Sequence, residues 1–436
     1  MSIKKHIKMP KEVFWLMPGL QVKRWFLMIV SGAVFATIGI CILFDLRPIL
    51  FFINLVQKFA NKVPSDLIAI AFVVIGGIIF LEGWQKSSFS LLDVNGERDE
   101  KFLLEQLYKR RKLNNGPKIV AVGGGTGLST LLKGLKEITN NITAIVTVGD
   151  DGGSSGRLRQ ELGVLPPGDI RNCIAALASD EDLMTELMQY RFKNGEGLEG
   201  HSFGNLFLTA LCSITGDMFR AVRATSNVLS IRGRVLPSTL DDMRLAAEME
   251  DGTIVRGESL IPEAKKKIKR LFCEPANCKA LDEVIESIKQ ADLIILGPGS
   301  LYTSVIPNLL IDEISKTISK SKAKKIYICN IMTQPGETDG YSVSDHVRAI
   351  MEHAKYPNMI ETVMVNNVLP QSLIDTYKAA KAEPVILDKN KLAELGVKIT
   401  SSRLTENNQK LIRHSSYKLA RAIYTWYRKQ KGASKE

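Results

Sequence analysis

The 436-residue chain contains few metal-binding and redox-active side chains. It has six cysteines, no two of them in a CxxC pair, and only five histidines. Cys273 and Cys278 stand five residues apart without partner histidines, so we expect no zinc site. The composition also excludes a disordered chain, a collagen-like repeat and a disulfide-rich miniprotein. We therefore expect folded domains with reduced, buried thiols.

The chain also lacks a basic character spread over its length. Its formal net charge is +12, but residues 1–24 contribute +5 and residues 403–436 contribute +7, whereas the long middle, 119–402, carries −3. A nucleic-acid-binding domain concentrates lysine and arginine on the folded part that contacts phosphates. We therefore expect no nucleic-acid partner, and a basic tail that lies on anionic lipid.

Charged residues are absent from a long run near the N-terminus. Residues 25–44 are uncharged, and 20 such residues suffice for a helix across roughly 30 Å of hydrocarbon. A second run, 67–84, contains a shorter stretch of consecutive apolar residues. It reaches across the bilayer only if Glu82 and Trp84 lie at the membrane–water interface. Because lysine and arginine flank the pair, both ends are expected in the cytoplasm. The sequence predicts a membrane hairpin within residues 1–90, with transmembrane helices at about 25–44 and 67–84; buried core helices are the alternative.

After a polar linker at 91–117, short apolar runs alternate with glycine-rich turns and helical patterns, without a repeat of fixed period. This alternation predicts an α/β domain with a Rossmann-like, mostly parallel sheet and helices on both faces. We expect a small β-rich insertion at about 227–260 and a basic helical tail at 401–436. The expected strands are 118–122, 142–148, 291–297, 324–332, 361–367 and 383–388.

In such a sheet, ligands bind at the carboxyl ends of the strands, so the loops after the strands are candidate sites. The first is GGGTG at 123–127, between a strand and a helical pattern. Glycines let backbone amides approach a phosphate, and a helix N-terminus favours an anion. The dinucleotide fingerprint fails because Leu128 stands at its third glycine position, and a Walker A loop is absent. We expect Gly124, Gly125, Thr126 and Gly127 to bind a phosphate-bearing ligand; a structural turn is the alternative.

Carboxylates and hydroxyls follow the second expected strand in GDDGGSSGR, at 149–157. Two adjacent carboxylates suit a divalent ion or sugar hydroxyls, although they can also cap a turn. PPGDIRN and GHSFGN each open a further helical pattern. The alternative role of Asp169 is a helix N-cap, and that of His201 is a structural residue at the start of a helix. The candidate ligand residues in these three motifs are Asp150, Asp151, Ser154, Ser155, Arg171, Asn172, His201 and Asn205.

Two later strand ends complete the candidate cleft. GPGSLYTS, at 297–304, is a second candidate anion site, and the stretch around TQPGET offers amide side chains that can read a base or sugar. No Ser-His-Asp order or Cys-His pair indicates nucleophilic catalysis. The motifs therefore favour binding of a nucleotide diphosphate compound. The candidate residues here are Gly297, Pro298, Gly299, Ser300, Thr303, Asn330 and Gln334.

Together these motifs resemble the YvcK group of the CofD-like family, bacterial proteins also called gluconeogenesis factors. The resemblance covers 118–400 and lies in KIVAVGGGTGLSTLLKGL, VTVGDDGGSSGRLR, PPGDIRN, GHSFGNL, ILGPGSLYTSVIPNLL and CNIMTQPGETDGYSVSDH. It implies a nucleotide-sugar-binding domain for a ligand such as UDP-N-acetylglucosamine. It also implies support of cell shape and cell-wall synthesis during gluconeogenic growth. It does not cover residues 1–90.

The enzyme relative CofD implies an alternative function, a Mg²⁺-dependent transfer of a phospholactyl group from a guanosine diphosphate donor to a deazaflavin. By that likeness, Asp151 and Asp169 would be the metal pair and Mg²⁺ the candidate cofactor. We find no deazaflavin-handling features in the sequence and expect a non-catalytic regulator. The expected partners are a UDP-sugar, membrane lipids, cell-wall synthesis proteins and further copies of the chain. The expected location is the bacterial cell membrane, crossed twice, with the large C-terminal domain cytoplasmic.

Overall fold

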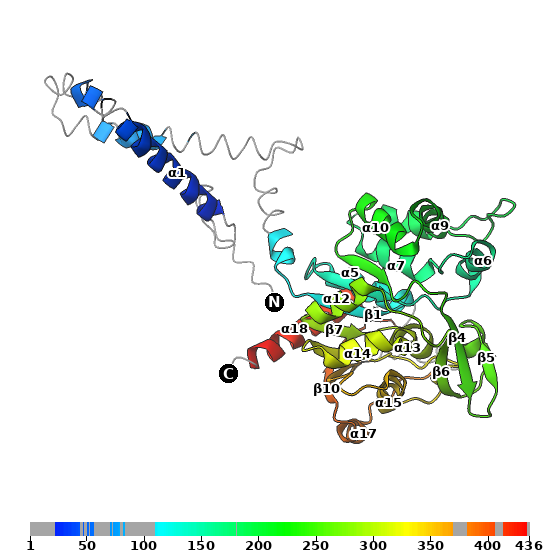
Figure 1. Cartoon of the computed structure of the whole chain (residues 1–436). Coiled ribbons are helices and arrows are strands. Elements are labelled where there is room, and N and C mark those ends of the chain that lie inside the picture. Colours follow the sequence, from blue (N-terminus) through cyan, green and yellow to red (C-terminus); the bar gives the residue numbers. More distant parts are fainter. Residues whose placement is uncertain are drawn as a thin grey trace. The chain divides into compact units, whose positions relative to one another are not determined.

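The structure is a computed structural model in which the chain divides into two compact units, Met1–Lys112 and Leu113–Glu436. The residues that it describes are 22–43, 47, 50, 51, 53–55, 70, 71, 73–78, 82, 110–179, 181–368, 382–405 and 413–433. Figure 1 draws the chain with these parts as ribbons.

The first unit contains helix α1, Val22–Leu43. Its first turn carries Lys23 and Arg24. In the second apolar run, the structure describes residues 70, 71, 73–78 and 82, and the rest of the predicted helix at about 67–84 lies outside the described residues. Over the described ranges, no helix combines the length and the apolar character needed to cross a membrane. This finding overturns the predicted transmembrane helices at about 25–44 and 67–84, and with them the two-pass membrane location. The predicted linker, 91–117, lies outside the described residues up to 109.

The second unit is built on a seven-stranded sheet in the order β10-β9-β8-β7-β1-β2-β3, and every neighbouring pair in it is parallel. The central strands are buried throughout, as expected for a parallel sheet covered on both faces. The predicted parallel α/β sheet is thus confirmed. Its strands are β1 (Ile119–Gly123), β2 (Ile142–Val146), β3 (Arg234–Pro237), β7 (Leu293–Leu296), β8 (Lys324–Ile328), β9 (Thr362–Asn366) and β10 (Lys398–Ser402).

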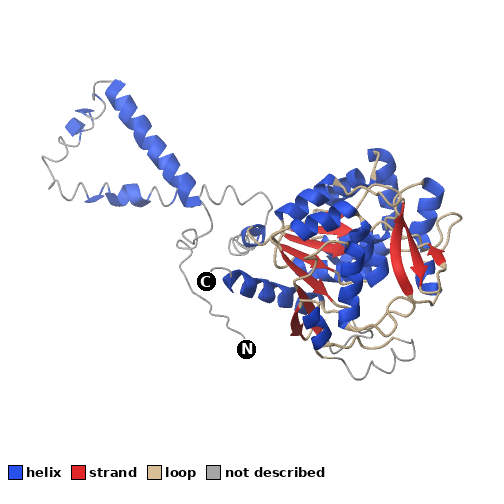
Figure 2. Ribbon diagram, turned by 60° about the horizontal axis from the view of Figure 1, so that its bottom comes forward, coloured by secondary structure: helices blue, strands red, loops and turns tan. Residues whose placement is uncertain are grey.

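Helices surround this sheet in Figures 1 and 2, and they pack in two groups. One group joins α5 to α7 and α18, and the other joins α12, α13, α14 and α15. The helices of the unit are α5 (Gly125–Leu135), α6 (Gly153–Leu162), α7 (Gly168–Leu177), α8 (Glu181–Gln189), α9 (Phe203–Thr215), α10 (Met218–Val228), α11 (Leu260–Glu263), α12 (Asp282–Gln290), the π-helix η3 (Leu301–Val305), α13 (Ile306–Leu310), α14 (Asp312–Lys320), α15 (Val343–Ala354), α17 (Lys389–Glu394) and α18 (Ser416–Ala433).

The strand order places a topological switch point between β1 and β7. From β1 the chain proceeds to β2 and β3 on one side, and from β7 it proceeds to β8, β9 and β10 on the other. Right-handed crossovers in opposite directions leave a crevice at the carboxyl ends of the two central strands, where ligands bind in open α/β sheets. The glycine loops after β1 and β7 therefore face each other across this crevice.

A separate three-stranded antiparallel sheet lies beside the main one, in the order β5-β4-β6. Its strands are β4 (Arg244–Met249), β5 (Ile254–Arg256) and β6 (Ile268–Glu274). It corresponds to the predicted β-rich insertion but is shifted toward the C-terminus, because β3 has three buried residues and pairs with β2 in the main sheet. The expected strand at 383–388 forms only an isolated bridge, Met332 to Pro384, and β10 takes the edge position instead.

The C-terminal helix α18 belongs to the core. Leu419, Ala420 and Ile423 are buried, and the helix packs against α5. The contact is so close at Gly134 of α5 that any Cβ there would collide with the carbonyl oxygen of Ser416. The apolar face of the predicted basic tail is therefore used within the fold.

Candidate functional site

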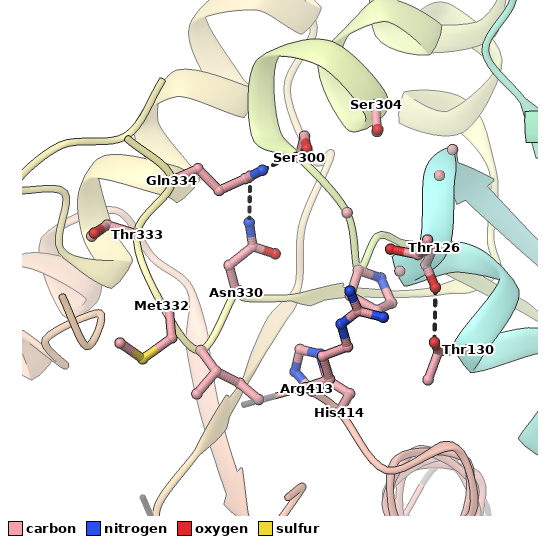
Figure 3. A pocket seen from close by; sticks show the side chains of 16 residues that line it. Thr126, Thr130, Ser300, Ser304, Asn330, Met332, Thr333, Gln334, Arg413 and His414 are labelled. Carbon is pink, nitrogen blue, oxygen red and sulfur yellow. Dashed lines mark hydrogen bonds between the residues drawn. The ribbon is translucent and has the colours of Figure 1, made fainter. Parts of the chain in front are cut away.

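A pocket of about 350 Å³ lies at the switch point, at the carboxyl ends of β1, β7 and β8 (Figure 3). Three loops and the segment before α18 form its walls. The lining residues are Gly124, Gly125, Thr126, Gly127, Thr130, Pro298, Gly299, Ser300, Ser304, Asn330, Ile331, Met332, Thr333, Gln334, Arg413 and His414.

The first wall is the GGGTG loop, which turns directly from β1 into α5. Gly125 has a φ of +61°, a left-handed conformation that favours glycine. At Gly127, a Cβ would lie 2.5 Å from the carbonyl oxygen of Pro298, so only glycine lets the two loops meet this closely. The backbone at the start of α5 is thus exposed to the pocket, an arrangement that suits a phosphate.

The second wall, the GPGS loop, is held in place by its neighbours. Gly297 donates its amide to the carbonyl of Val122 at 2.8 Å, and the Gly297–Pro298 peptide is cis. The Asn308 side-chain amide donates to the carbonyls of Gly123 (3.2 Å) and Ser304 (2.8 Å). These bonds fix the two glycine loops relative to each other.

The predicted ligand residue Thr303 is engaged within the protein. Its hydroxyl donates to Glu337 Oε1 at 3.3 Å, and the amide of Tyr302 donates to Glu337 Oε2 at 3.2 Å. Burial raises the pKa of Glu337 to about 7, against the opposing effect of these hydrogen bonds. Glu337 carried no signal in the sequence beyond its place in the TQPGET motif.

The third wall presents two amide side chains. Gln334 Nε2 donates to Ser300 Oγ at 2.7 Å, and Asn330 Nδ2 donates to Gln334 Oε1 at 3.3 Å (Figure 3). This chain links the loop after β8 to the loop after β7. It leaves Asn330 Oδ1 as an acceptor at the pocket.

Arg413 and His414 also line the pocket, and the sequence reasoning missed both (Figure 3). They lie beyond the motifs, in the segment interpreted as a basic tail. Burial lowers the pKa of His414 to about 4, so its imidazole is neutral at pH 7. Arg413 is exposed and supplies a permanent positive charge. Thr130, about one helical turn beyond the GGGTG loop, was missed as well, and so was Ser304, the last residue of the GPGSLYTS motif.

The carboxylates after β2 lie beside the GGGTG loop, outside the pocket lining. Burial raises the pKa of Asp169 to about 6, and the nearby Asp150 adds to the shift, while the Gly125 amide opposes it. Burial also raises the pKa of Glu258 to about 8, with further contributions from Asp150 and Asp151. Glu258, which sequence reasoning missed, comes from the segment after β5.

Asp151 has a structural task. Its two carboxylate oxygens accept the amides of Glu258 and Ser259, both at 2.9 Å, and so tie the segment after β5 to the end of β2. In the part of the chain that the structure describes, no group of three or more acidic, histidine or cysteine side chains is arranged to hold a metal ion. Asp151 and Asp169 stay a predicted Mg²⁺ pair, because one or two carboxylates together with water and substrate phosphates are the usual ligands of this ion.

The remaining predicted residues form a buried polar cluster. Asn205 Nδ2 donates to Ser154 Oγ at 3.0 Å, and Ser154 Oγ lies 2.9 Å from His201 Nδ1. The tautomer of His201 decides whether the Ser154 hydroxyl donates to Nδ1 or accepts from it, because a hydroxyl can accept two hydrogen bonds. All three side chains are buried. The cluster joins the GGSSG and GHSFGN motifs.

Arg171, Asn172 and Ser155 make similar links. Arg171 donates to Ser202 Oγ and, at 2.9 Å, to Asn172 Oδ1. The Gly168 amide donates to Ser155 Oγ at 3.1 Å, which joins the PPGDIRN and GGSSG motifs.

The predicted residues thus fall into two groups. Nine of them line the pocket: Gly124, Gly125, Thr126, Gly127, Pro298, Gly299, Ser300, Asn330 and Gln334. The others support its walls or form the adjacent polar cluster: Gly297, Thr303, Asp150, Asp151, Ser154, Ser155, Arg171, Asn172, His201 and Asn205.

Comparisons with known proteins give the chain its family. Residues 119–405 match the family model of 2-phospho-L-lactate transferase CofD. The gluconeogenesis factor of Bacillus subtilis is 50% identical over 305 residues, which cover 70% of this chain and 96% of that protein. A Nostoc sp. protein with the same description, qualified there as unproven, is 52% identical over 420 residues, 95% of this chain and 92% of that protein.

The fold has a solved counterpart. A crystal structure of a Bacillus halodurans protein has 51% sequence identity and a TM-score of 0.69, and the match covers 71% of this chain and all of that one. The family model names a transferase, whereas the names of the relatives state no enzymatic activity. The chain belongs to the CofD-like family, among the homologues of the gluconeogenesis factors of the YvcK group.

Proposed function

We propose that this protein is a UDP-sugar-binding regulatory factor, with a ligand of the UDP-N-acetylglucosamine type, that supports cell shape and cell-wall synthesis under gluconeogenic growth. The observation that carries the proposal is the pocket at the switch point, where the GGGTG backbone faces Arg413 across an open space. Cell-wall synthesis proteins are its proposed partners, and self-association stays a prediction.

The composition of the pocket supports binding over catalysis. Among the described residues that line it, the polar groups are hydroxyls, amides, one arginine and the neutral His414, with neither a carboxylate nor a cysteine. A diphosphate fits the amides at the start of α5, with Arg413 as its counter-charge. Asn330 and Gln334 then lie within the same pocket to bind the base or the sugar.

Calorimetric titration of the full chain with UDP-N-acetylglucosamine tests the proposal. We expect saturable binding to the wild type, weaker binding of uridine alone, and none to Gly127→Ala. The Gly123→Ala protein is the matched control, because its Cβ would meet only ordinary contacts at 3.7 Å or more. Absence of heat at millimolar ligand, with and without magnesium, would exclude a UDP-sugar ligand.

A CofD-like transferase is the second candidate function. The family-model match favours it, as does the group of Asp150, Asp169 and Glu258 beside the GGGTG loop. Incubation with a guanosine diphosphate donor of the phospholactyl group and a deazaflavin would yield the transferred product. The product should be lost in Asp169→Ala and retained in Glu263→Gln, an exposed carboxylate of α11. Lack of product with the wild type would leave the binding function alone.

A further inference from the structure

The start of helix η3 presents hydrogen-bond donors to the loop after β8. The amides of Tyr302 and Thr303 point away from the helix body, and the Thr303 hydroxyl joins them. These groups directly follow the GPGS loop that forms one wall of the pocket.

A carboxylate of the protein itself fills this position. Glu337 accepts from the Tyr302 amide with one oxygen and from the Thr303 hydroxyl with the other, and its side chain is only 7% exposed. The loop that carries it is fixed on both sides. The Gly336 amide donates to Asp339 Oδ2 at 2.7 Å, and Gly336 packs so tightly on the carbonyl of Pro262 that a Cβ would not fit.

The same loop also reaches the pocket directly. Gln334, three residues before Glu337, donates to Ser300 Oγ, and the carbonyl of Gln334 accepts the amides of Glu337 and Thr338. Two polar links, one from Gln334 and one from Glu337, therefore join the loop after β8 to the segment 300–303. One link lies inside the pocket and the other lies behind its wall.

We propose that Glu337 is a positioning residue for the ligand pocket: its carboxylate accepts the hydrogen bonds of Tyr302 and Thr303 at the start of η3 and thereby holds the GPGS wall in the shape that binds the ligand. The part of this inference that is tested by ligand binding rests on the proposed function. The part that is tested by amide hydrogen exchange needs no ligand. In this role, the GPGS segment shapes the pocket, while the amides of Tyr302 and Thr303 that follow it remain hydrogen-bonded to Glu337.

The role predicts a dependence on pH with a definite sign. With a pKa of about 7, Glu337 is ionised above neutral pH and then accepts the hydrogen bonds most strongly. Below neutral pH it becomes neutral and the links weaken. The other titratable groups that interact with it are Glu258, from the segment after β5, and Tyr302. Because Asp169 also titrates near the GGGTG loop, the effect of Glu337 must be read as the difference between wild type and variant.

The experiment compares wild type, Glu337→Gln and the matched control Glu263→Gln. Amide hydrogen exchange of Tyr302 and Thr303 is measured without ligand, and the dissociation constant for UDP-N-acetylglucosamine is measured at pH 8.5 and pH 5.5. We expect Glu337→Gln to speed exchange at these two amides and to weaken binding about tenfold at pH 8.5, the loss expected for charge-assisted hydrogen bonds. The difference from wild type should shrink at pH 5.5.

The outcomes separate the inference from the proposed function. If wild type binds no UDP-sugar but Glu337→Gln speeds exchange at Tyr302 and Thr303, the proposed function fails and the capping of η3 stands. Unchanged exchange, or equal or tighter ligand binding by Glu337→Gln at pH 8.5, overturns the positioning role. Should Glu337→Gln fail to fold, the wild type still decides: exchange at the two amides must slow between pH 5.5 and pH 8.5 relative to other buried amides, after correction for intrinsic rates.

Discussion

The two glycine loops that face each other at the switch point have the same local plan, but the helices that follow them differ in how their first turns are exposed to the pocket. Each follows a buried central strand, β1 or β7, and each leads into a helix. The start of α5 opens into the pocket with its backbone unobstructed by a side chain of the loop. The start of η3 is capped by Glu337, which comes from a different loop.

This difference shows that a strand–glycine loop–helix pattern defines a potential anion site without defining its occupant. At η3 the occupant is internal, because the loop after β8 folds back onto it. At α5 the carboxylate of Asp169 accepts a hydrogen bond from the Gly125 amide. Asp169 itself does not line the pocket, so the GGGTG backbone stays exposed to it. We therefore expect a ligand anion to bind at the start of α5 and not at the start of η3.

The largest effect is expected from closing the open loop. Gly127→Ala would place a Cβ within 3 Å of backbone atoms of Pro298 and Gly299, which is closer than a Cβ can approach without a shift of one of the two loops. We expect loss of detectable UDP-sugar binding and a destabilisation of about 1–3 kcal/mol from overpacking. Calorimetry and thermal unfolding measure the two effects. Gly123→Ala should leave both close to wild type; an equal loss in both variants would contradict the steric argument.

Removing the positive charge that faces the open loop should have the next largest effect. Arg413→Gln is expected to weaken binding of the diphosphate ligand about tenfold at low salt, since a charge-assisted contact to phosphate is lost. The loss should shrink as the ionic strength rises. Arg421→Gln, on the exposed face of α18, is the control. A salt-independent loss would indicate that Arg413 acts through packing.

A smaller effect is expected from the link inside the pocket. Ser300→Ala removes the acceptor of Gln334 Nε2, and we expect binding to weaken by a factor of about three to ten. The same measurement in Gln334→Ala and in the double variant gives the coupling between the two residues. Strictly additive losses would show that each residue contacts the ligand independently of the other.

The smallest effect concerns the acidic side of the open loop. Glu258 ionises near pH 4.5 when unfolded and near pH 8 in the folded protein, so the folded state binds the extra proton between these values. Wild-type stability should therefore fall as the pH rises from about 4.5 to 8. Glu258→Gln should raise Tm by a few degrees at pH 8 and leave it unchanged at pH 4. An equal shift at both pH values would show that ionisation is not the cause.

Local signals in the sequence were enough to predict the core of the fold. The apolar runs at 118–122 and 142–148 predicted β1 and β2, because a strand buried on both faces reads as an uninterrupted apolar segment. The edge strand β10 was missed, because Lys398–Ser402 is only partly buried and polar residues follow its first two positions. The short buried strand β3 was assigned to the insertion, since its pairing with β2 is a long-range contact.

The site could be predicted as far as its loops. Motif chemistry identified nine lining residues, because ligands in open α/β sheets bind at the carboxyl ends of the strands, where these loops lie. It could not identify Arg413, which reaches the pocket only because α18 packs on α5. Nor could it distinguish residues that line the pocket from those that hold it, such as Asp151 and Thr303. That distinction depends on partners far away in the sequence.

The packing of α18 on α5 also has a consequence for synthesis of the protein. The GGGTG loop is made early, but Arg413, His414 and the helix that supports α5 come from the last part of the described chain. A nascent chain still lacking this part can form β1 and its loop while the pocket remains without one wall. We therefore expect a product truncated before residue 413 to bind the proposed ligand more weakly than a chain that contains this wall, even if its sheet had folded.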